Sequence, residues 1–381
     1  MVRVFLVNAS AASRLYGIGN YVDIVFNALS KSTQIHPILV DFNQTNSSEE
    51  VWIKDGQNWG KFTCYFKASS LYSLPIKKLL DLIHEHYTIT SQDVFHINTP
   101  NHLELIRMVK KRYNCKAVYT IHFDTRKLHK DRDDTQKKEK EILKLADRII
   151  CLSFDIKTYW SSVINSSKLS LISTGLNPIR NWCKNKKIGF RQKLNIGGED
   201  IVILFNGRID YQKGFYELLK VFPLLLESFP NIHLIVVGDG NLSEALEKSR
   251  KILGRILFTG YVNRKDKAFI KHIYQISDIF VLPSFNEQLS LSFLEAANNS
   301  VATIVSDIPS FSRFPNNLVS KVSISNKQTI DQKDLYDKLA ILISSKSYRN
   351  KLGRSLCSYC RTNFSGKKFQ SDLIEIYEKQ A

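Results

Sequence analysis

The strongest constraint on the fold of this chain is a rhythm of short apolar runs and longer amphipathic segments that occurs twice. In the first half, candidate strands lie at 2–8, 36–42, 93–98, 116–122, 148–153 and 169–174. Such an alternation is typical of βαβ units around a parallel sheet. A stretch with six basic and no acidic residues from Arg180 to Lys193 interrupts the pattern. The rhythm then restarts, with candidate strands at 201–207, 231–240, 255–262, 278–284, 301–307 and 318–323.

This organisation predicts two doubly wound α/β domains in tandem. A chain of 381 residues is longer than a single ordinary core requires. We place a Rossmann-like N-terminal domain at 1–178, a basic interdomain linker at 179–198, and a second Rossmann-like domain at 199–360. Ligands of open α/β sheets bind beyond the carboxyl ends of the strands, so we expect the chemistry in a cleft where the two domains face each other.

The charge and composition narrow the class of protein. Lysine and arginine number 54 against 36 acidic residues, and this net charge of +18 attracts phosphates of nucleotides, nucleic acids or anionic membranes. No apolar run reaches the length of a transmembrane helix and the six cysteines are scattered, so we expect a cytoplasmic protein. The basic, aromatic segment 60–80 fits an anionic membrane surface or, as we favour, a strand and an amphipathic helix. A peripheral position on the inner face of the membrane is the alternative location.

The loop after the first strand of the second half carries a basic pair. In FNGRIDYQKGF (205–215), Arg208 and Lys213 stand five positions apart, after Gly207 and before a helical pattern. Arginine binds phosphate as a bidentate fork and lysine as a point charge, so the pair is suited to one diphosphate. Gly238 lies in the turn after the next strand and permits a ligand to approach the backbone closely.

The segment SFNEQLSLSFLEAANNS (284–300) contains two carboxylates whose partners the sequence does not supply. Glu287 lies in the turn after a predicted buried strand, and the chain has a helical pattern from about Ser290. Glu295 then shares a helical face with Leu291 and other apolar residues, so we expect it to be buried and to need donors from backbone, an arginine or ligand hydroxyls. The helix start between the two acids favours an anion. Together they fit an extended ligand that carries a phosphate.

Three other motifs have both a functional and a structural interpretation. His122 ends the strand pattern YTIH, and a buried structural histidine is the alternative to a ligand contact. Gly17 and Gly19 precede an amphipathic segment. Either their backbone amides face an anion at the start of a helix, or the two glycines form a plain turn. Asp131 and Asp133 form a D-x-D inside a charged loop and not after a buried strand, so we predict no metal site.

In combination, these motifs resemble a known family. The Arg and Lys loop, GDG, and two glutamates eight positions apart are similar to those of the retaining GT-B glycosyltransferases of family 4, or glycosyl transferases group 1, which include bacterial polysaccharide transferases. The resemblance covers most of residues 200–310 and extends loosely to the N-terminal glycines, YTIH and the segment 146–153. It implies a metal-independent transferase without a cofactor, which moves a sugar from a nucleotide-sugar, a UDP-sugar being favoured, to a glycan, lipid-linked or protein acceptor with retention. It also implies that the C-terminal helix, 361–381, crosses back to the first domain.

The resemblance assigns roles to the candidate residues. Arg208 and Lys213 would stabilise the leaving diphosphate, and Glu287 would hold the sugar near its reacting carbon. His122 would contact the sugar from the acceptor domain, and Glu295 would accept hydrogen bonds from the ribose hydroxyls. The other implied donor-binding residues are Gly17, Gly19, Gly207, Gly238, Tyr261, Val262, Gln288, Leu289, Ser290 and Leu291.

The chain also departs from the family pattern. Gln288, Leu289 and Ser290 replace the glycines usual after the first glutamate, and Ser300 and Ala302 replace a usual glycine and proline. A catalytically inactive homologue that acts as a partner subunit is therefore an alternative. A basic nucleic-acid-binding protein is a second alternative, which we favour less because the chain has no clustered platform of aromatic and basic residues.

Overall fold

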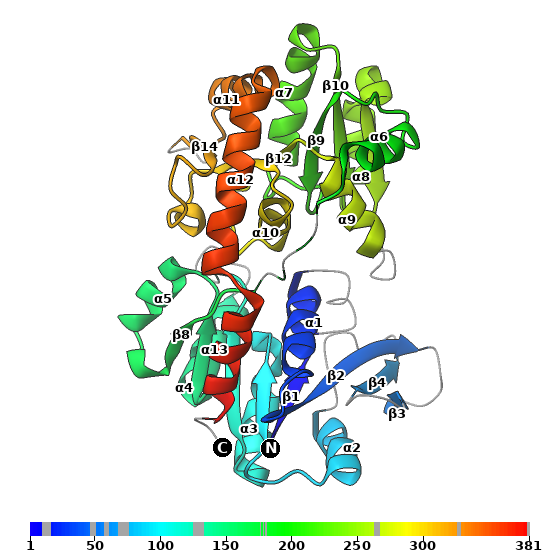
Figure 1. The fold of residues 1–381 in the computed structure, drawn as a ribbon. Coiled ribbons are helices and arrows are strands. Elements are labelled where there is room, and N and C mark those ends of the chain that lie inside the picture. The colour runs from blue at the N-terminus through cyan, green and yellow to red at the C-terminus, as the bar shows by residue number, and fades with distance from the viewer. Residues whose placement is uncertain are drawn as a thin grey trace. The chain divides into compact units, whose positions relative to one another are not determined.

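The computed structural model describes the backbone of most of the chain. It covers residues 1–9, 17–45, 51–56, 61–67, 76–124, 133–175, 177, 179, 181–262, 267–325 and 329–378. The chain forms two compact units, unit 1 from residues 1–175 and 366–381 and unit 2 from residues 176–365. Each unit has its own largely parallel sheet (Figure 1) and its own hydrophobic core.

The sheet of unit 1 has the strand order β3-β4-β2-β1-β5-β6-β7-β8. Its strands are β1 (Val2–Val7), β2 (Ile35–Thr45), β3 (Val51–Gly56), β4 (Lys61–Lys67), β5 (Val94–Ile97), β6 (Lys116–Ile121), β7 (Arg148–Cys151) and β8 (Leu169–Leu171). Only β3 pairs antiparallel, with β4 at the edge of the sheet. All six predicted strands of this half are present, and β4 supplies the strand that we favoured within 60–80, whereas β3 was not predicted.

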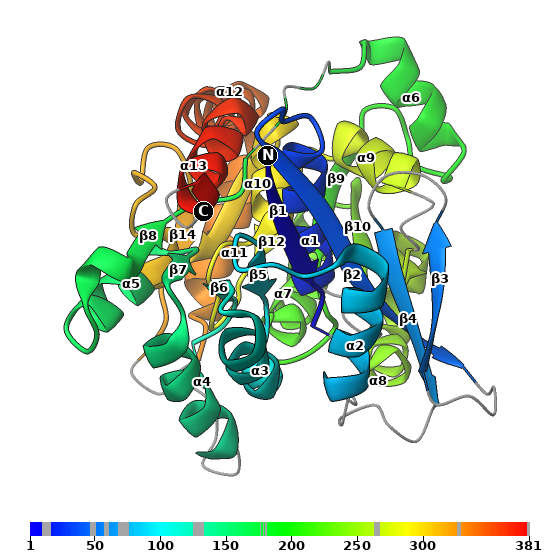
Figure 2. The ribbon, with the colours of Figure 1, turned by 90° about the horizontal axis from the view of Figure 1, so that it is seen from below.

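Helices form two groups around this sheet. They are α1 (Gly17–Leu29), α2 (Ile76–Tyr87), α3 (Leu103–Tyr113), α4 (Asp133–Leu145), α5 (Phe154–Ser161) and α13 (Gly366–Glu378), with short 3-10 turns at Pro100–His102 and Ser166–Lys168. α13 packs beside α1 and β1, whereas α3 contacts α2 and α4 (Figure 2). A buried hydrogen bond of 2.7 Å between Tyr377 and His96 Nδ1 fixes α13 to β5.

The sheet of unit 2 is entirely parallel, with the order β11-β10-β9-β12-β13-β14. Its strands are β9 (Ile201–Asn206), β10 (Ile232–Val237), β11 (Ile256–Gly260), β12 (Ile279–Leu282), β13 (Ala302–Ser306) and β14 (Ser320–Val322). The order is that of a doubly wound Rossmann-like sheet. Successive strands are added on one side of β9 up to β11, and from β12 onward they are added on its other side. The predicted α/β class with two such sheets is therefore confirmed.

The helices of unit 2 include one inside the predicted linker. They are α6 (Lys184–Gln192), α7 (Phe215–Ser228), α8 (Leu242–Lys248), α9 (Lys267–Ile276), α10 (Leu291–Asn298), α11 (Gln332–Ser344) and α12 (Lys346–Asn363), with 3-10 turns at Arg250–Arg255 and Pro309–Phe311. The stretch 179–198 thus contains α6 and is not linker throughout. α6 contacts α9.

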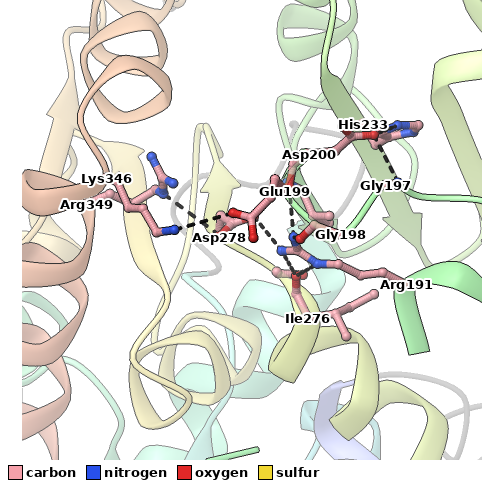
Figure 3. A network of polar contacts seen from close by, with 12 residues as sticks. Arg191, Gly197, Gly198, Glu199, Asp200, His233, Ile276, Asp278, Lys346 and Arg349 are labelled. Carbon is pink, nitrogen blue, oxygen red and sulfur yellow. Dashed lines mark hydrogen bonds and ion pairs between the residues drawn. The ribbon is translucent and has the colours of Figure 1, made fainter. Parts of the chain in front are cut away.

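Hydrogen bonds of Arg191 hold α6 against the rest of unit 2. Its buried guanidinium donates to the backbone carbonyls of Ile276, Gly198 and Asp200 and lies 2.7 Å from Asp278 Oδ2 (Figure 3). These partners lie at the amino-terminal edge of the sheet, where Asp278 precedes β12. A buried guanidinium is stabilised only when its donors are paired, and here five hydrogen bonds pair them.

No helix in the described part of the chain is long and apolar enough to span a membrane.

Candidate functional site

Two loops of unit 2 meet where its strand order reverses. β9 and β12 are parallel neighbours, so the loops 207–214 and 283–290 leave the sheet at the same carboxyl edge. The backbone amide of Phe285 donates to the carbonyl of Gln212 at 2.9 Å and joins the two loops directly. Open α/β sheets bind ligands at this position.

An ion pair links the same loops through their side chains. Lys213 Nζ lies 2.6 Å from Oε1 of Glu287, and Ser284 Oγ donates to that oxygen at 2.9 Å. The Glu287 side chain is only 7% exposed, and that of Lys213 is 22% exposed. Because a buried carboxylate is costly unless it is paired, Lys213 and Ser284 explain how Glu287 is accommodated. The structure thus brings together two of the predicted catalytic residues.

Two glycines allow the backbones around the site to approach each other closely. Gly214 has a φ of +69°, and a Cβ at this position would lie 1.9 Å from the carbonyl oxygen of Pro283. Gly238 has a φ of +128°, and its Cβ would lie 2.1 Å from the carbonyl oxygen of Gly207. A side chain fits neither the backbone conformation nor the space, so glycine is required at both positions.

Arg208 lies in the same loop but faces solvent more fully. Its side chain is 50% exposed, donates to Gln212 Oε1 at 2.9 Å and lies 3.1 Å from Asp210 Oδ2. Because contacts of an exposed guanidinium are weak, exchanging them for a phosphate costs little free energy. The donors of Arg191, by contrast, are already used in hydrogen bonds within unit 2. Both cations of the loop are paired with an acid, but Arg208 is accessible at 50% exposure whereas Lys213 is 22% exposed.

The helix start between the two glutamates is capped by a side chain. α10 begins at Leu291, and Oγ of Ser290 accepts a hydrogen bond from the Phe293 amide at 3.2 Å. Gln288 and Ser290 are buried, whereas Leu289 and Leu291 are half-buried. The serine that replaces a glycine of the family pattern thus occupies one of the amides with which a helix N-terminus binds anions.

The expected burial of Glu295 is wrong, because its side chain is exposed. The buried residues of α10 are its neighbours Phe293, Leu294, Ala296, Ala297 and Asn298, which face α12 and β13. Leu291 and Ser292, one turn before Glu295, are only half-buried, so this side of the helix faces solvent and carries Glu295. Its carboxylate raises the pKa of Tyr274, although burial of that phenol is the larger cause. An exposed carboxylate at this position is accessible to ligand hydroxyls.

At the carboxyl edge of unit 1, His122 pairs with an asparagine that we did not predict. His122 follows β6 and Asn98 follows the neighbouring β5, and the distance from His122 Nε2 to Asn98 Oδ1 is 2.9 Å. Tyr21 meets the imidazole edge-on, with ring centroids 4.8 Å apart. Burial lowers the pKa of His122 to about 3, and the neighbouring His96 lowers it as well. The ring is therefore neutral near pH 7.

The prediction that Gly17 and Gly19 precede the helix is wrong, because α1 begins at Gly17 and contains both glycines in its first turn. Glycine lowers helix propensity by about 1 kcal/mol, but burial of residues such as Tyr21 and Val25 on the sheet outweighs this cost. Their amides still lie at a helix N-terminus, where an anion is favoured.

The last donor-binding candidates lie at the end of β11. Tyr261 and Val262 follow that strand directly, and Tyr261 is 39% exposed. The carbonyl of Gly260 accepts a hydrogen bond from the amide of Gly238 at 3.1 Å, so this turn is tied to the edge that carries Gly207.

Three residues were missed from the sequence, one at the carboxyl edge of unit 1 and two beside the Lys213–Glu287 pair of unit 2. Asn98 follows the buried strand β5 directly and Ser284 lies two residues after the buried strand β12, and a polar residue just past a strand of an α/β sheet is the signal that could have found them. Ser310 donates through its hydroxyl to the backbone carbonyl of Glu287. It carries no comparable signal, since 23 residues separate it from its partner.

The described side chains include no group of three or more His, Cys, Asp or Glu residues placed to hold a metal ion. Asp131 of the D-x-D lies outside the described residues, and the structure does not describe the side chain of Asp133.

Comparisons with known proteins identify the family. The family model for Glycosyltransferase Family 4 matches residues 17–180, and that for Glycosyl transferases group 1 matches residues 186–355. The O-antigen biosynthesis glycosyltransferase WclY of Escherichia coli is 24% identical over 328 residues, which are 82% of this chain and 85% of WclY. Sucrose-phosphate synthase from Thermosynechococcus elongatus aligns over 99% of this chain and 98% of its own, with a TM-score of 0.78 and 16% identity. Anabaena HepE in complex with UDP-glucose aligns over 100% of both chains, with a TM-score of 0.74 and 14% identity.

The family models indicate a glycosyltransferase for unit 1 and for unit 2, and the solved structures align over both units. At such low identity the solved structures establish the fold, whereas the two family models together reach from unit 1 into unit 2. The resemblance predicted from the motifs is thereby confirmed at the level of the family. The chain belongs to the GT-B glycosyltransferases of the family 4 type.

Proposed function

We propose that this glycosyltransferase moves a sugar from a nucleotide-sugar, with a UDP-sugar favoured, to a hydroxyl of a glycan, lipid-linked or protein acceptor. The transfer retains the anomeric configuration and needs no metal ion. The observation that carries the proposal is the pairing of Lys213 with Glu287 beside the accessible Arg208, at the edge of a Rossmann-like sheet. HepE, which shares the fold, was solved with UDP-glucose, and WclY is named for O-antigen biosynthesis, which supports a polysaccharide or other glycoconjugate as the product.

The side chains divide the work by charge. Arg208 and Lys213 stabilise the negative charge that develops on the leaving diphosphate, so cations of the protein serve where other enzymes use a metal ion. Glu287 accepts hydrogen bonds from sugar hydroxyls, and its pairing with Lys213 fixes both groups before the substrate arrives. Glu295 accepts from ribose hydroxyls, and His122 accepts from a sugar hydroxyl. The amides of residues 288–291 and the glycine-lined turns bind the phosphates.

Transfer assays with variants test this assignment. A thermal-shift panel of nucleotide-sugars first selects the donor, because a ligand of the folded state raises the unfolding midpoint. With that donor, we expect Arg208→Ala, Lys213→Ala and Glu287→Ala each to lower kcat by about 10²- to 10³-fold, the usual loss when one electrostatic contact to the transition state is removed. Lys220→Ala is the control, since Lys220 pairs with Glu217 on α7 and is 52% exposed.

Three results would overturn parts of the proposal. If Arg208→Ala and Glu287→Ala both keep the full transfer activity of the unaltered protein, the assignment of the site is wrong. Inversion of the anomeric configuration, read from the NMR spectrum of the product, removes retention. Loss of activity in a chelator, restored by a divalent ion, removes metal independence.

The two alternatives differ from this proposal in measurable ways. A catalytically inactive homologue would bind a nucleotide-sugar without transfer to any acceptor. Salt-sensitive binding of nucleic acid without any response to nucleotide-sugars would favour a nucleic-acid-binding protein, which membership of a glycosyltransferase family does not favour. Sedimentation with anionic liposomes would test a peripheral location at the membrane.

A further inference from the structure

The orientation of the Asn98 amide is determined by its two partners. Asn98 is 1% exposed and follows β5. Its Nδ2 donates to the carbonyl oxygen of Val7 at 3.0 Å. A carbonyl oxygen can only accept, so the NH₂ group must face Val7, and a flipped amide would place two acceptors against each other. The remaining amide oxygen, Oδ1, therefore faces Nε2 of His122 at 2.9 Å.

This amide orientation places the proton on the imidazole. An amide oxygen has no hydrogen to donate, so a hydrogen bond between Asn98 Oδ1 and His122 Nε2 requires Nε2 to carry the hydrogen. In the neutral ring, Nδ1 then holds a lone pair in the ring plane. The hydrogen bond at Nε2 is the one that His122 makes in the described part of the chain, so Nδ1 is left without a partner there.

We propose that Asn98 is a positioning residue, which fixes His122 as the Nε2–H tautomer and thereby presents Nδ1 as a hydrogen-bond acceptor for a hydroxyl group of the sugar substrate. The inference rests on the proposed function for the identity of the ligand, but the tautomer follows from this chain alone. A neutral acceptor suits a hydroxyl, which can donate to it. It suits a phosphate oxygen poorly, because two acceptors repel each other.

The neighbours of the ring hold it in one position. The ring of Tyr21, from α1, makes a T-shaped contact with the imidazole, and the Tyr21 hydroxyl lies 3.3 Å from Oγ1 of Thr120. Thr120 in turn lies 2.7 Å from Nε2 of the buried His96. Among the residues that the structure describes, Tyr21 contacts the imidazole and His96 lowers its pKa. Neither carries charge near pH 7, since burial lowers the pKa of His96 to about 3 and raises that of Tyr21. A neutral surrounding keeps His122 an acceptor rather than a cation.

The tautomer can be measured without any substrate. Long-range ¹H–¹⁵N spectra of the full chain labelled with ¹⁵N-histidine distinguish Nε2–H from Nδ1–H. We expect His122 to be the Nε2–H form in the unaltered protein and to interconvert between both forms in Asn98→Ala. Asn98→Asp keeps an oxygen opposite Nε2, so the Nε2–H form should persist, and the added negative charge should raise the pKa of His122. Its second oxygen faces the Val7 carbonyl in place of the NH₂ group, so this variant should also be less stable than the unaltered protein.

Asn8→Ala is the matched control. Asn8 is also buried at this edge of the sheet, at 2% exposure, but its Nδ2 donates to Asp41 Oδ1 at 3.0 Å. It should leave the His122 tautomer unchanged even if it lowers stability as much as Asn98→Ala. An Nδ1–H form in the unaltered protein, or an unchanged His122 signal in Asn98→Ala, overturns the proposal.

Kinetics then test whether the tautomer matters for transfer. With the selected donor, Asn98→Ala should lower kcat by about tenfold, the loss expected for one misplaced hydrogen bond, and should have no further effect in a His122→Ala background. Additive losses from the two substitutions would mean that Asn98 acts by another route and would overturn the role. Failure of every nucleotide-sugar to support transfer would instead overturn the proposed function, while the spectra would still decide the tautomer.

Discussion

The two units have similar sheets, but their carboxyl edges carry different chemistry. In unit 2, that edge holds the ion pair of Lys213 and Glu287 and the exposed Arg208. In unit 1, the same edge holds a neutral pair, His122 and Asn98. In the mechanism that we propose, the charged groups stabilise the leaving diphosphate and the neutral acceptor recognises hydroxyls, so the two edges serve different parts of the chemistry.

Within unit 2, the two edges of one sheet differ as well. The polar network of Arg191, Asp278 and their backbone partners at the amino edge satisfies its own donors and acceptors (Figure 3). At the carboxyl edge, half of the Arg208 side chain remains exposed. The type of residue therefore does not separate a structural arginine from a candidate site arginine, but its place along the sheet and the number of donors already engaged do.

The largest loss of stability should come from a substitution that prevents the close approach of the Gly214 and Pro283 backbones at the carboxyl edge of unit 2. Gly214→Ala forces a Cβ to within 1.9 Å of the Pro283 carbonyl oxygen at a φ of +69°. We expect the free energy of unfolding to fall by about 3 kcal/mol or more, the cost of backbone strain and overpacking, as measured by urea denaturation. Gly254→Ala is the control, because nothing lies within 4 Å of its Cβ. Equal effects of the two substitutions would contradict this account of the loop.

Acid should lower the free energy of unfolding of unit 1 through its buried histidines. We expect this loss to be smaller than that of Gly214→Ala. His102 is 2% exposed, and burial lowers its pKa from 6.5 to about 4. Between about pH 7 and pH 5 the unfolded chain takes up a proton that the folded chain excludes, so this group costs about 2 kcal/mol of stability as the pH falls. His102→Leu should remove that loss, measured as the change in unfolding free energy between the two pH values.

The exposed His36, replaced by leucine in the same way, serves as the control for the acid experiment. If both variants alter the pH dependence equally, burial of His102 is not its cause.

The smallest effect concerns the helix start at the candidate phosphate site. Ser290→Gly removes the cap on the Phe293 amide and should cost only a few tenths of a kcal/mol. It also frees that amide for a phosphate, so UDP should bind roughly twofold more tightly by calorimetry, the gain from one weak hydrogen bond. Ser345→Gly, which removes the equivalent cap of α12, is the control. Weaker binding to Ser290→Gly would mean that the serine itself contacts the ligand.

The sequence by itself determined the class of fold and the loops that carry the candidate site. The alternation of apolar runs and amphipathic helices is local information, because each strand is buried on both faces and each helix on one. Because all strands of a parallel sheet end at the same edge, the Arg208 loop and the Glu287 loop, which each follow a strand, were expected at that edge. The family followed from motifs at those two loops.

Only the tertiary structure decided which side chains meet and which are exposed. Lys213 and Glu287 are 74 residues apart and His122 and Asn98 are 24 apart, and no local pattern pairs them. The exposure of Glu295 and the burial of Arg191 were not evident for the same reason, since burial depends on what packs against a helix and not on its own sequence. Pairing and burial set the energy of a charge, and both are properties of the whole fold.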